Sequence, residues 1–175
     1  MSTRSAALAA AAGLIAAAAA SAQEGPNLGR PATPAEIAGW DITIEPDGTG
    51  LPPGSGDARA GEAVYMAKCL ACHGAEGAGQ LNDRLAGGHG TLKDPAPVRT
   101  IGSYWPHATT VFDYVRRAMP YTMPQSLSDD EVYAVTAYLL YVNDIIGERD
   151  VMNAETLPAV RMPNRDNFIV AYPPP

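Results

Sequence analysis

The residues best suited to chemistry stand together in the sequence KCLACHG, which contains both cysteines of the chain, Cys69 and Cys72, followed directly by His73. A disulfide between the two cysteines would close a very small, strained loop and constrain the unfolded chain little. A structural zinc ion needs four ligands, and the sequence adds only His89 and His107, at irregular spacing. Neither role explains the pattern.

The spacing Cys-x-x-Cys-His predicts one covalently attached haem c. The two thiols add across the two vinyl groups of one porphyrin edge, and the imidazole of His73 then binds the iron from below the ring. The alternative is a dithiol redox pair with an incidental histidine. Such pairs usually lie at a strand-to-helix junction, whereas the residues before Cys69 have a helical pattern.

Residues 1–22 have the features of a secretory signal peptide: a basic start at Arg4, an apolar run, and an Ala-Ser-Ala ending before Gln23. A retained membrane anchor is the alternative, but the run is short for a bilayer span and mostly alanine. We therefore expect no stable membrane insertion and a periplasmic protein, since haem c is attached outside the cytoplasm.

The charge of the chain excludes several classes of partner. The formal net charge is −7, and removal of Arg4 with the signal makes it one unit more negative. Lys68 and Lys93 are the only lysines. This balance disfavours binding to nucleic acid or to anionic membranes, and it disfavours a small mobile cytochrome with a ring of lysines.

Composition divides the processed chain into three parts. Residues 23–56 form a Pro- and Gly-rich N-terminal arm, residues 57–143 carry the haem motif and the periodic segments, and residues 144–175 form a C-terminal arm ending in AYPPP. About 150 residues suffice for one domain with a core. Within the N-terminal arm, Trp40, Ile42 and Ile44 alternate with polar residues, and this pattern predicts a short strand with the three apolar side chains on one side.

The middle part predicts an all-α domain. One helix starts at a cap on Asp57 and runs into the haem motif, and a second spans about 107–118 and stops before Pro120. A third begins at Ser128, which forms a capping box with Glu131.

The first and third helices are expected to cross closely. Gly61 lies one turn before Tyr65 and offers no side chain, so another helix can approach there. The helix that carries Tyr138 is the natural partner, since Val132, Val135, Leu139 and Val142 form an apolar stripe along it.

The sixth iron ligand is expected from the loop RAMPYTMPQSLSDDE, which contains two Met-Pro pairs. Met119 lies nine positions before Ser128, which is far enough for the loop to cross a porphyrin face. Met123, only five positions before it, is the alternative ligand. The remaining candidates are Met152, Met162, His89 and His107, and the two histidines are expected at the surface or at a helix start.

Three further side chains are candidates for contacts with the haem propionates. Trp105 and Tyr104 can donate hydrogen bonds, and Arg99 can neutralise a carboxylate; ordinary packing and a surface position are the alternatives. We expect no catalytic acid, base or nucleophile in this chain.

The motif CLACHG, the Met-Pro loop and the capped helix resemble class I cytochrome c. The stretches GRPATPAEIAGWDITIEPDGTG, RTIGSYWPHATTVFDYVRRAMP and LPAVRMPNRDNF are more particular and resemble the SoxD family, the cytochrome subunits of periplasmic sulfane dehydrogenases. By position, the resemblance assigns haem attachment to Cys69 and Cys72, the proximal ligand to His73 and the distal ligand to Met119. Some members carry a second haem domain, whereas this chain has a single motif.

The resemblance implies a partner subunit with a molybdenum cofactor that oxidises sulfane sulfur or sulfite. This chain would accept the electrons one at a time and pass them to another cytochrome. Two alternatives remain: a free soluble electron carrier, and a ligand-binding or sensory haem protein with an open sixth site.

The apolar residues of the arms have two possible roles: to wrap the chain's own haem domain or to clasp a partner. Those of the C-terminal arm are Val160, Met162, Phe168, Ile169 and Tyr172.

Overall fold

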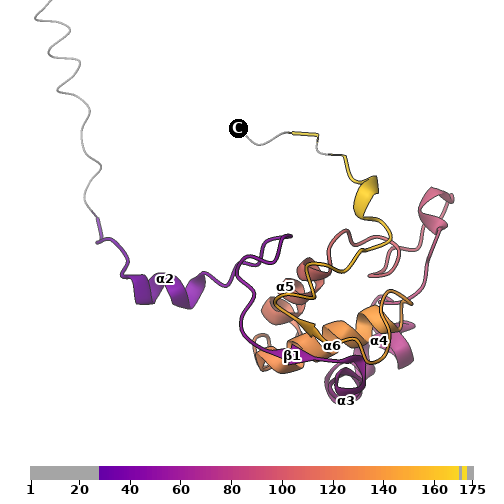
Figure 1. Ribbon diagram of the computed structural model, residues 1–175, viewed down its shortest axis with the longest axis horizontal. Helices are drawn as coiled ribbons and strands as arrows, with labels where there is room; N and C mark the ends of the chain where they lie inside the picture. Colours follow the sequence, from indigo (N-terminus) through magenta and orange to yellow (C-terminus); the bar gives the residue numbers. More distant parts are fainter. Residues whose placement is uncertain (1–27, 170, 173–175) are drawn as a thin grey trace, which may run out of the picture. The chain divides into compact units, whose positions relative to one another are not determined.

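The computed structural model describes residues 28–169 and 171–172, which fall into two units, one ending at Asp41 and one starting at Ile42 (Figure 1). The predicted signal peptide lies outside the described residues. None of the helices within the described ranges is long and apolar enough to cross a membrane.

The larger unit is built mainly of helices, which confirms the all-α prediction. Its α-helices are α3 (Ala58–Lys68), α4 (Leu70–His73), α5 (Ala108–Ala118) and α6 (Asp129–Tyr141). Short 3-10 turns occur at η1 (Ala75–Gly77), η2 (Thr91–Lys93) and η3 (Arg165–Asn167). Two-residue strands β1 (Ser55–Gly56) and β2 (Met152–Asn153) pair antiparallel and join the two arms.

The helix starts follow the local signals in the sequence. The carboxylate of Asp57 accepts a hydrogen bond from the Ala60 amide at 2.8 Å. The Ser128 hydroxyl accepts one from the Glu131 amide at 3.3 Å, and the Glu131 carboxylate accepts one from the Ser128 amide at 2.8 Å. These bonds satisfy amides that the helix itself leaves without partners, so both predicted caps are confirmed.

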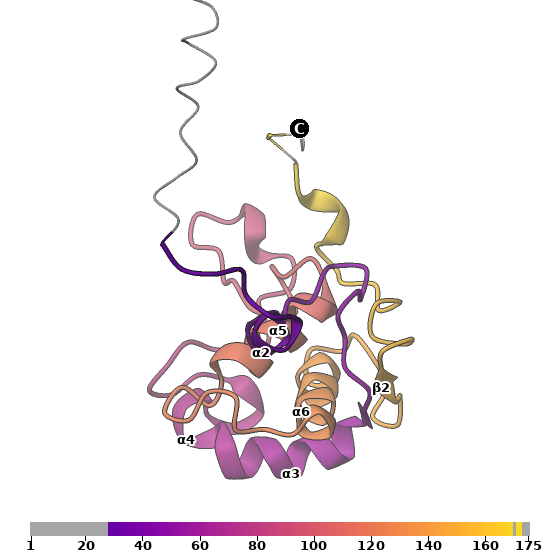
Figure 2. The same ribbon diagram turned by 90° about the vertical axis from the view of Figure 1, so that its left-hand side faces the viewer.

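Helices α3 and α6 pack against each other, with α3 along the lower edge of the view and α6 above it (Figure 2). Gly61 is buried, and a Cβ added there would overlap the carbonyl of Ala134 and lie 2.8 Å from the Cβ of Tyr138. One turn on, the rings of Tyr65 and Tyr138 pack with centroids 5.0 Å apart. The predicted close crossing is confirmed, and α6 is buried on all sides rather than along one stripe.

The arms lie partly in the core of the larger unit. Ile44, Leu157, Val160 and Met162 are buried in the same apolar cluster as the helices. Farther along the C-terminal arm, the side chains are exposed: Phe168, Ile169 and Tyr172. Of the two predicted roles, wrapping the haem domain therefore holds for the parts of the arms nearest to it.

The strand predicted at residues 40–44 is wrong. Trp40 is the last residue of helix α2 (Pro34–Trp40), and Ile42 and Ile44 lie outside any strand. Thr33 and Glu36 form a capping box ahead of these residues. This local helix signal, together with Pro34 at the first helical position, outweighs an alternation of only three apolar residues.

Candidate functional site

The haem motif occupies one turn between α3 and the loop that follows. Helix α3 ends at Lys68, and the amides of Cys72 and His73 both donate to the carbonyl of Cys69, at 3.1 and 3.0 Å. Gly74 then ends the turn with φ +73°, a conformation that glycine adopts without strain. Both thiols and the imidazole are half-buried on this single turn, so they can all face one group.

The loop after the motif folds back and fixes the imidazole. The Gly79 amide donates to the carbonyl of His73 at 2.7 Å, and the Asn82 amide donates to that of Cys72 at 2.9 Å. The Nδ1 atom of His73 lies 3.0 Å from the carbonyl oxygen of Asp83. Because a carbonyl only accepts, Nδ1 carries the proton and Nε2 keeps its lone pair, as a metal-binding histidine requires.

Tyr65 anchors the same turn from inside the core. Its side chain is fully buried, and its hydroxyl donates to the carbonyl of Gly74 at 2.8 Å. The pKa of Tyr65 is raised to about 12, mainly by burial and secondly by the nearby Cys69. The residue directly after the predicted iron ligand is thus tied to the helix that precedes the motif.

Replacing Tyr65 with phenylalanine is expected to lower the free energy of unfolding by about 1–2 kcal/mol at pH 7, because the Gly74 carbonyl loses its partner. The folded-state pKa of Tyr65 lies above its ordinary value near 10, so the folded state keeps a proton that the unfolded state releases between pH 10 and about 12. This stabilising contribution is complete below pH 10 and is lost as the pH rises toward 12.

Guanidinium unfolding of the wild type and the variant at pH 7 and at several values up to pH 12 measures this effect. The difference in unfolding free energy between the wild type and Tyr65→Phe should become smaller as the pH rises. Tyr121→Phe, at an exposed tyrosine, is the control and should track the wild type. A gap for Tyr65→Phe that stays constant up to pH 12 would contradict the assignment.

The two cysteines do not form a disulfide. The pKa of the Cys69 thiol is raised to about 11, mainly by burial and secondly by the neighbouring Cys72. Thiol–disulfide exchange requires the thiolate, and redox-active pairs have at least one thiol with a lowered pKa. The environment of Cys69 therefore disfavours the dithiol redox alternative.

The methionines have different surroundings. Met119 follows the last residue of α5, is half-buried and packs against the core, and its amide donates to the carbonyl of Val115 at 3.0 Å. Met123 is 52% exposed, while Met152 and Met162 lie in the apolar core. Of the two methionines on the predicted loop, Met119 is the one that packs against the core.

The two remaining histidines lie where the sequence predicted, one at the surface and one at a helix start. His89 is exposed, and His107 is the residue before the first turn of α5. The Nδ1 atom of His107 is buried and has no hydrogen-bond partner among the described residues. The pKa of this side chain is lowered by burial and, to a smaller extent, by Arg165.

The predicted propionate contacts lie among aromatic side chains. The guanidinium carbon of Arg99 is 5.5 Å from the ring centroid of Tyr104, and that ring meets Phe168 edge-on at 5.5 Å. Trp105 is half-buried and meets Tyr114 edge-on at 5.7 Å. The contact between Tyr104 and the C-terminal arm was not foreseen in the sequence.

One further residue that orders this region carries little sequence signal. Asn143 is buried at the end of α6, where its amide donates to the carbonyls of Leu139 at 2.8 Å and Leu85 at 3.2 Å. Its carbonyl oxygen accepts from the Gly87 amide at 3.0 Å. An amide directly after the apolar run YLLYV was the only hint in the sequence.

Comparison with known proteins agrees with this geometry. The sequence model of the family called Cytochrome c matches residues 58–143. A thiosulfate dehydrogenase from Allochromatium vinosum is 36% identical over 84 residues, which is 48% of this chain and 31% of that protein. The chain therefore spans about a third of the length of this relative.

The likeness to a solved structure is broader. A chain in the crystal structure of the sulfane dehydrogenase SoxCD from Paracoccus pantotrophus is 47% identical, with a TM-score of 0.79. The match covers 83% of this chain and 72% of that chain.

The chain belongs to the cytochrome c family: it is an electron-transfer protein with the class I fold and a covalently attached haem c. Within that family it is a SoxD-like cytochrome. The fold, the cofactor and the resemblance predicted from the sequence are confirmed.

Proposed function

We propose that this chain is the periplasmic electron-transfer subunit of a molybdenum-containing sulfane or sulfite dehydrogenase. It accepts electrons from the molybdenum centre of its partner and passes them to another cytochrome. The observation that carries this proposal is the 47% identity to a chain of SoxCD over 83% of the present chain, which extends well beyond the cytochrome c domain.

The residues of the motif fit a haem. Cys69 and Cys72 supply the two thioether links, and His73 presents an Nε2 lone pair because its Nδ1 is engaged by the Asp83 carbonyl. Met119 would supply a further ligand to the haem iron, with Met123 as the alternative. Apolar side chains that pack against the core but stay half-exposed are available to cover a porphyrin: Leu70, Leu85, Trp105 and Leu127.

The haem supplies a one-electron iron couple. The chain's own residues hold the imidazole in one orientation, offer a thioether that favours the ferrous state, and limit contact with water. Trp105, Tyr104 and Arg99 are the candidate partners for the propionates. No bond to sulfur is made or broken by these residues, so that chemistry belongs to the partner subunit.

Affinity purification of the tagged, haem-loaded protein from the source periplasm tests the proposal. We expect a larger molybdenum protein to be recovered with it, at a molybdenum-to-iron ratio near one for a complex with one centre of each kind. Adding sulfite or a sulfane-loaded carrier protein should then reduce the haem within the complex.

Two results would favour the other candidate functions. Recovery of a lone monomer that exchanges electrons rapidly with an oxidase would indicate a free soluble carrier. Ready binding of carbon monoxide or cyanide to the native protein would indicate a ligand-binding haem protein, because a bound methionine excludes such ligands.

A further inference from the structure

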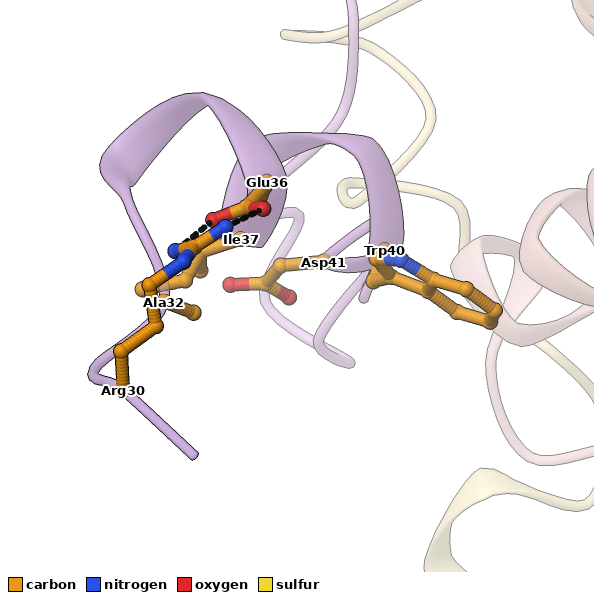
Figure 3. Close-up of a pocket in the computed structure, with 6 residues that line it drawn as sticks. All are labelled: Arg30, Ala32, Glu36, Ile37, Trp40 and Asp41. Atoms are coloured by element: carbon orange, nitrogen blue, oxygen red, sulfur yellow. Dashed lines mark hydrogen bonds and ion pairs between the residues drawn. The ribbon is translucent and has the colours of Figure 1, made fainter. Parts of the chain in front are cut away.

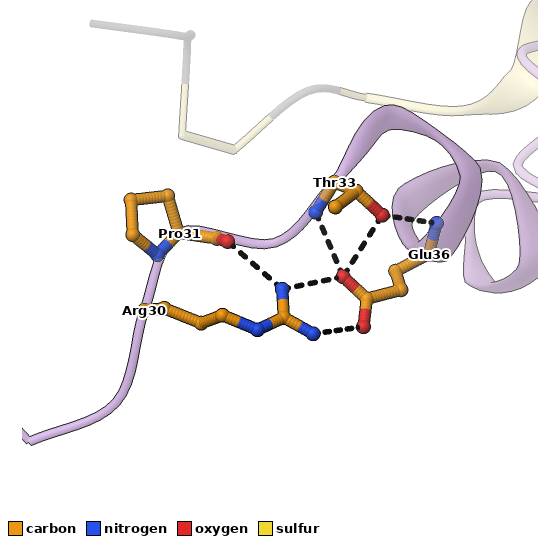
Figure 4. A network of polar contacts seen from close by, with 4 residues as sticks. All are labelled: Arg30, Pro31, Thr33 and Glu36. Carbon is orange, nitrogen blue, oxygen red and sulfur yellow. Dashed lines mark hydrogen bonds and ion pairs between the residues drawn. The ribbon is translucent and has the colours of Figure 1, made fainter.

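The unit that ends at Asp41 carries a short helix whose N-terminal end is held by side-chain contacts. In α2, the Thr33 hydroxyl accepts from the Glu36 amide at 3.3 Å, and the Glu36 carboxylate accepts from the Thr33 amide at 2.8 Å. Arg30 donates to both carboxylate oxygens of Glu36, at 2.8 and 2.6 Å (Figure 4). The pKa of Glu36 is lowered to about 2, first by Arg30 and then by Thr33.

This local order does not come from burial. None of the seven residues of α2 is buried, and an isolated helix of this length is normally unstable in water. The capping box, Pro34 at the first helical position and the Arg30 pair together favour the helical form before any partner is present. A preformed helix loses less conformational entropy when it binds.

The helix presents large apolar side chains to solvent. Ile37 is 52% exposed and Trp40 is 88% exposed. Their i, i+3 spacing places them on one side of the helix, and Figure 3 shows the Trp40 ring pointing away from the Arg30–Glu36 pair. Tryptophan is among the residues most enriched at the energetic centre of protein interfaces.

The structural likeness to the SoxCD chain extends into this segment. Residues 57–175 are 119 of the 175 residues, or 68% of the chain, whereas the likeness to the SoxCD chain covers 83%. The match therefore includes at least about 26 residues before Asp57, which is enough to reach the start of α2. A segment without buried residues of its own thus has a counterpart in a chain crystallised within a complex.

We propose that residues 28–41, the docking segment, bind an apolar groove of the molybdenum-containing subunit through Ile37 and Trp40. This inference rests on the proposed function. A short helix with anchors at i and i+3 matches the helix-in-groove mode of recognition. A second copy of this chain is the less favoured occupant, because the full sequence has a net charge of −7 and two such acidic copies would repel each other.

The double variant Ile37→Ala/Trp40→Ala tests the docking segment in the full-length, haem-loaded protein. The molybdenum subunit isolated from the native complex is titrated with each cytochrome. We expect the dissociation constant to rise at least about 10-fold. The haem spectrum, the reduction potential and the rate of haem reduction at saturating cytochrome should match those of the wild type.

Ala35→Ser is the matched control, since Ala35 is exposed and lies about 200° around the helix from Ile37; it should bind like the wild type. If the double variant binds the molybdenum subunit as tightly as the wild type, the docking inference is overturned while the proposed function stands. If the wild type itself does not bind, both fail. A variant that loses only self-association identifies a second copy as the occupant and also overturns the inference.

Discussion

The variant Met119→Ala is expected to lose the methionine–iron(III) charge-transfer absorption and to have a reduction potential lower by on the order of 0.1 V. Removal of the thioether withdraws the ligand that favours the ferrous state. It also opens the sixth position, so carbon monoxide and cyanide should bind readily. Absorption spectra of the ferric protein, a redox titration and ligand titrations measure these changes.

Met123→Ala is the control for this experiment. It removes the other methionine of the same loop, whose side chain is 52% exposed, and should leave the charge-transfer band in place. The assignment is wrong if the band survives in Met119→Ala and disappears in Met123→Ala, which would establish the alternative ligand.

The variant Gly61→Ala is expected to lower the free energy of unfolding by about 2–4 kcal/mol. The added methyl group would overlap the carbonyl of Ala134 and lie 2.8 Å from the Cβ of Tyr138. Both belong to the buried central helix α6, which has no room to move aside, so the crossing of α3 and α6 must open. Denaturant unfolding of the haem-loaded protein measures the loss.

Gly147→Ala serves as the matched control in the same unit. Gly147 is exposed, and a Cβ there would meet only the side chain of Asp150, at 3.3 Å or more. Its unfolding free energy should stay within about 0.5 kcal/mol of the wild type. Equal stability of the two variants would mean that α3 and α6 do not cross at Gly61.

Features that depend on neighbouring residues were predictable from the sequence. The cap at Asp57, the capping box of Ser128 with Glu131 and the haem motif each involve groups within four positions of one another. Their physical basis is local, because a helix end needs partners for its free amides wherever the helix lies. The Gly61 crossing was also foreseeable, since a missing side chain on a core helix permits close approach.

Features that depend on distant segments were not predictable. The hydrogen bond from Tyr65 to the Gly74 carbonyl and the edge-on contact of Tyr104 with Phe168 arise only when the fold places the loops. The short alternation of Trp40, Ile42 and Ile44 failed as a strand signal because, within the described ranges, no strand pairs with it. Strands need a partner, whereas α2 is satisfied by its own cap.

The two arms limit where this cytochrome domain can be cut or fused to another domain. Tyr133 of α6 donates to the carbonyl of Pro52, Thr109 of α5 donates to that of Pro46, and Leu157 fills the interior. A fusion protein that contained residues 58–143 alone would expose the apolar surface that the two arms cover. A further redox domain must therefore be joined before Ile44 or after Met162, outside the parts of the arms that are buried in the core.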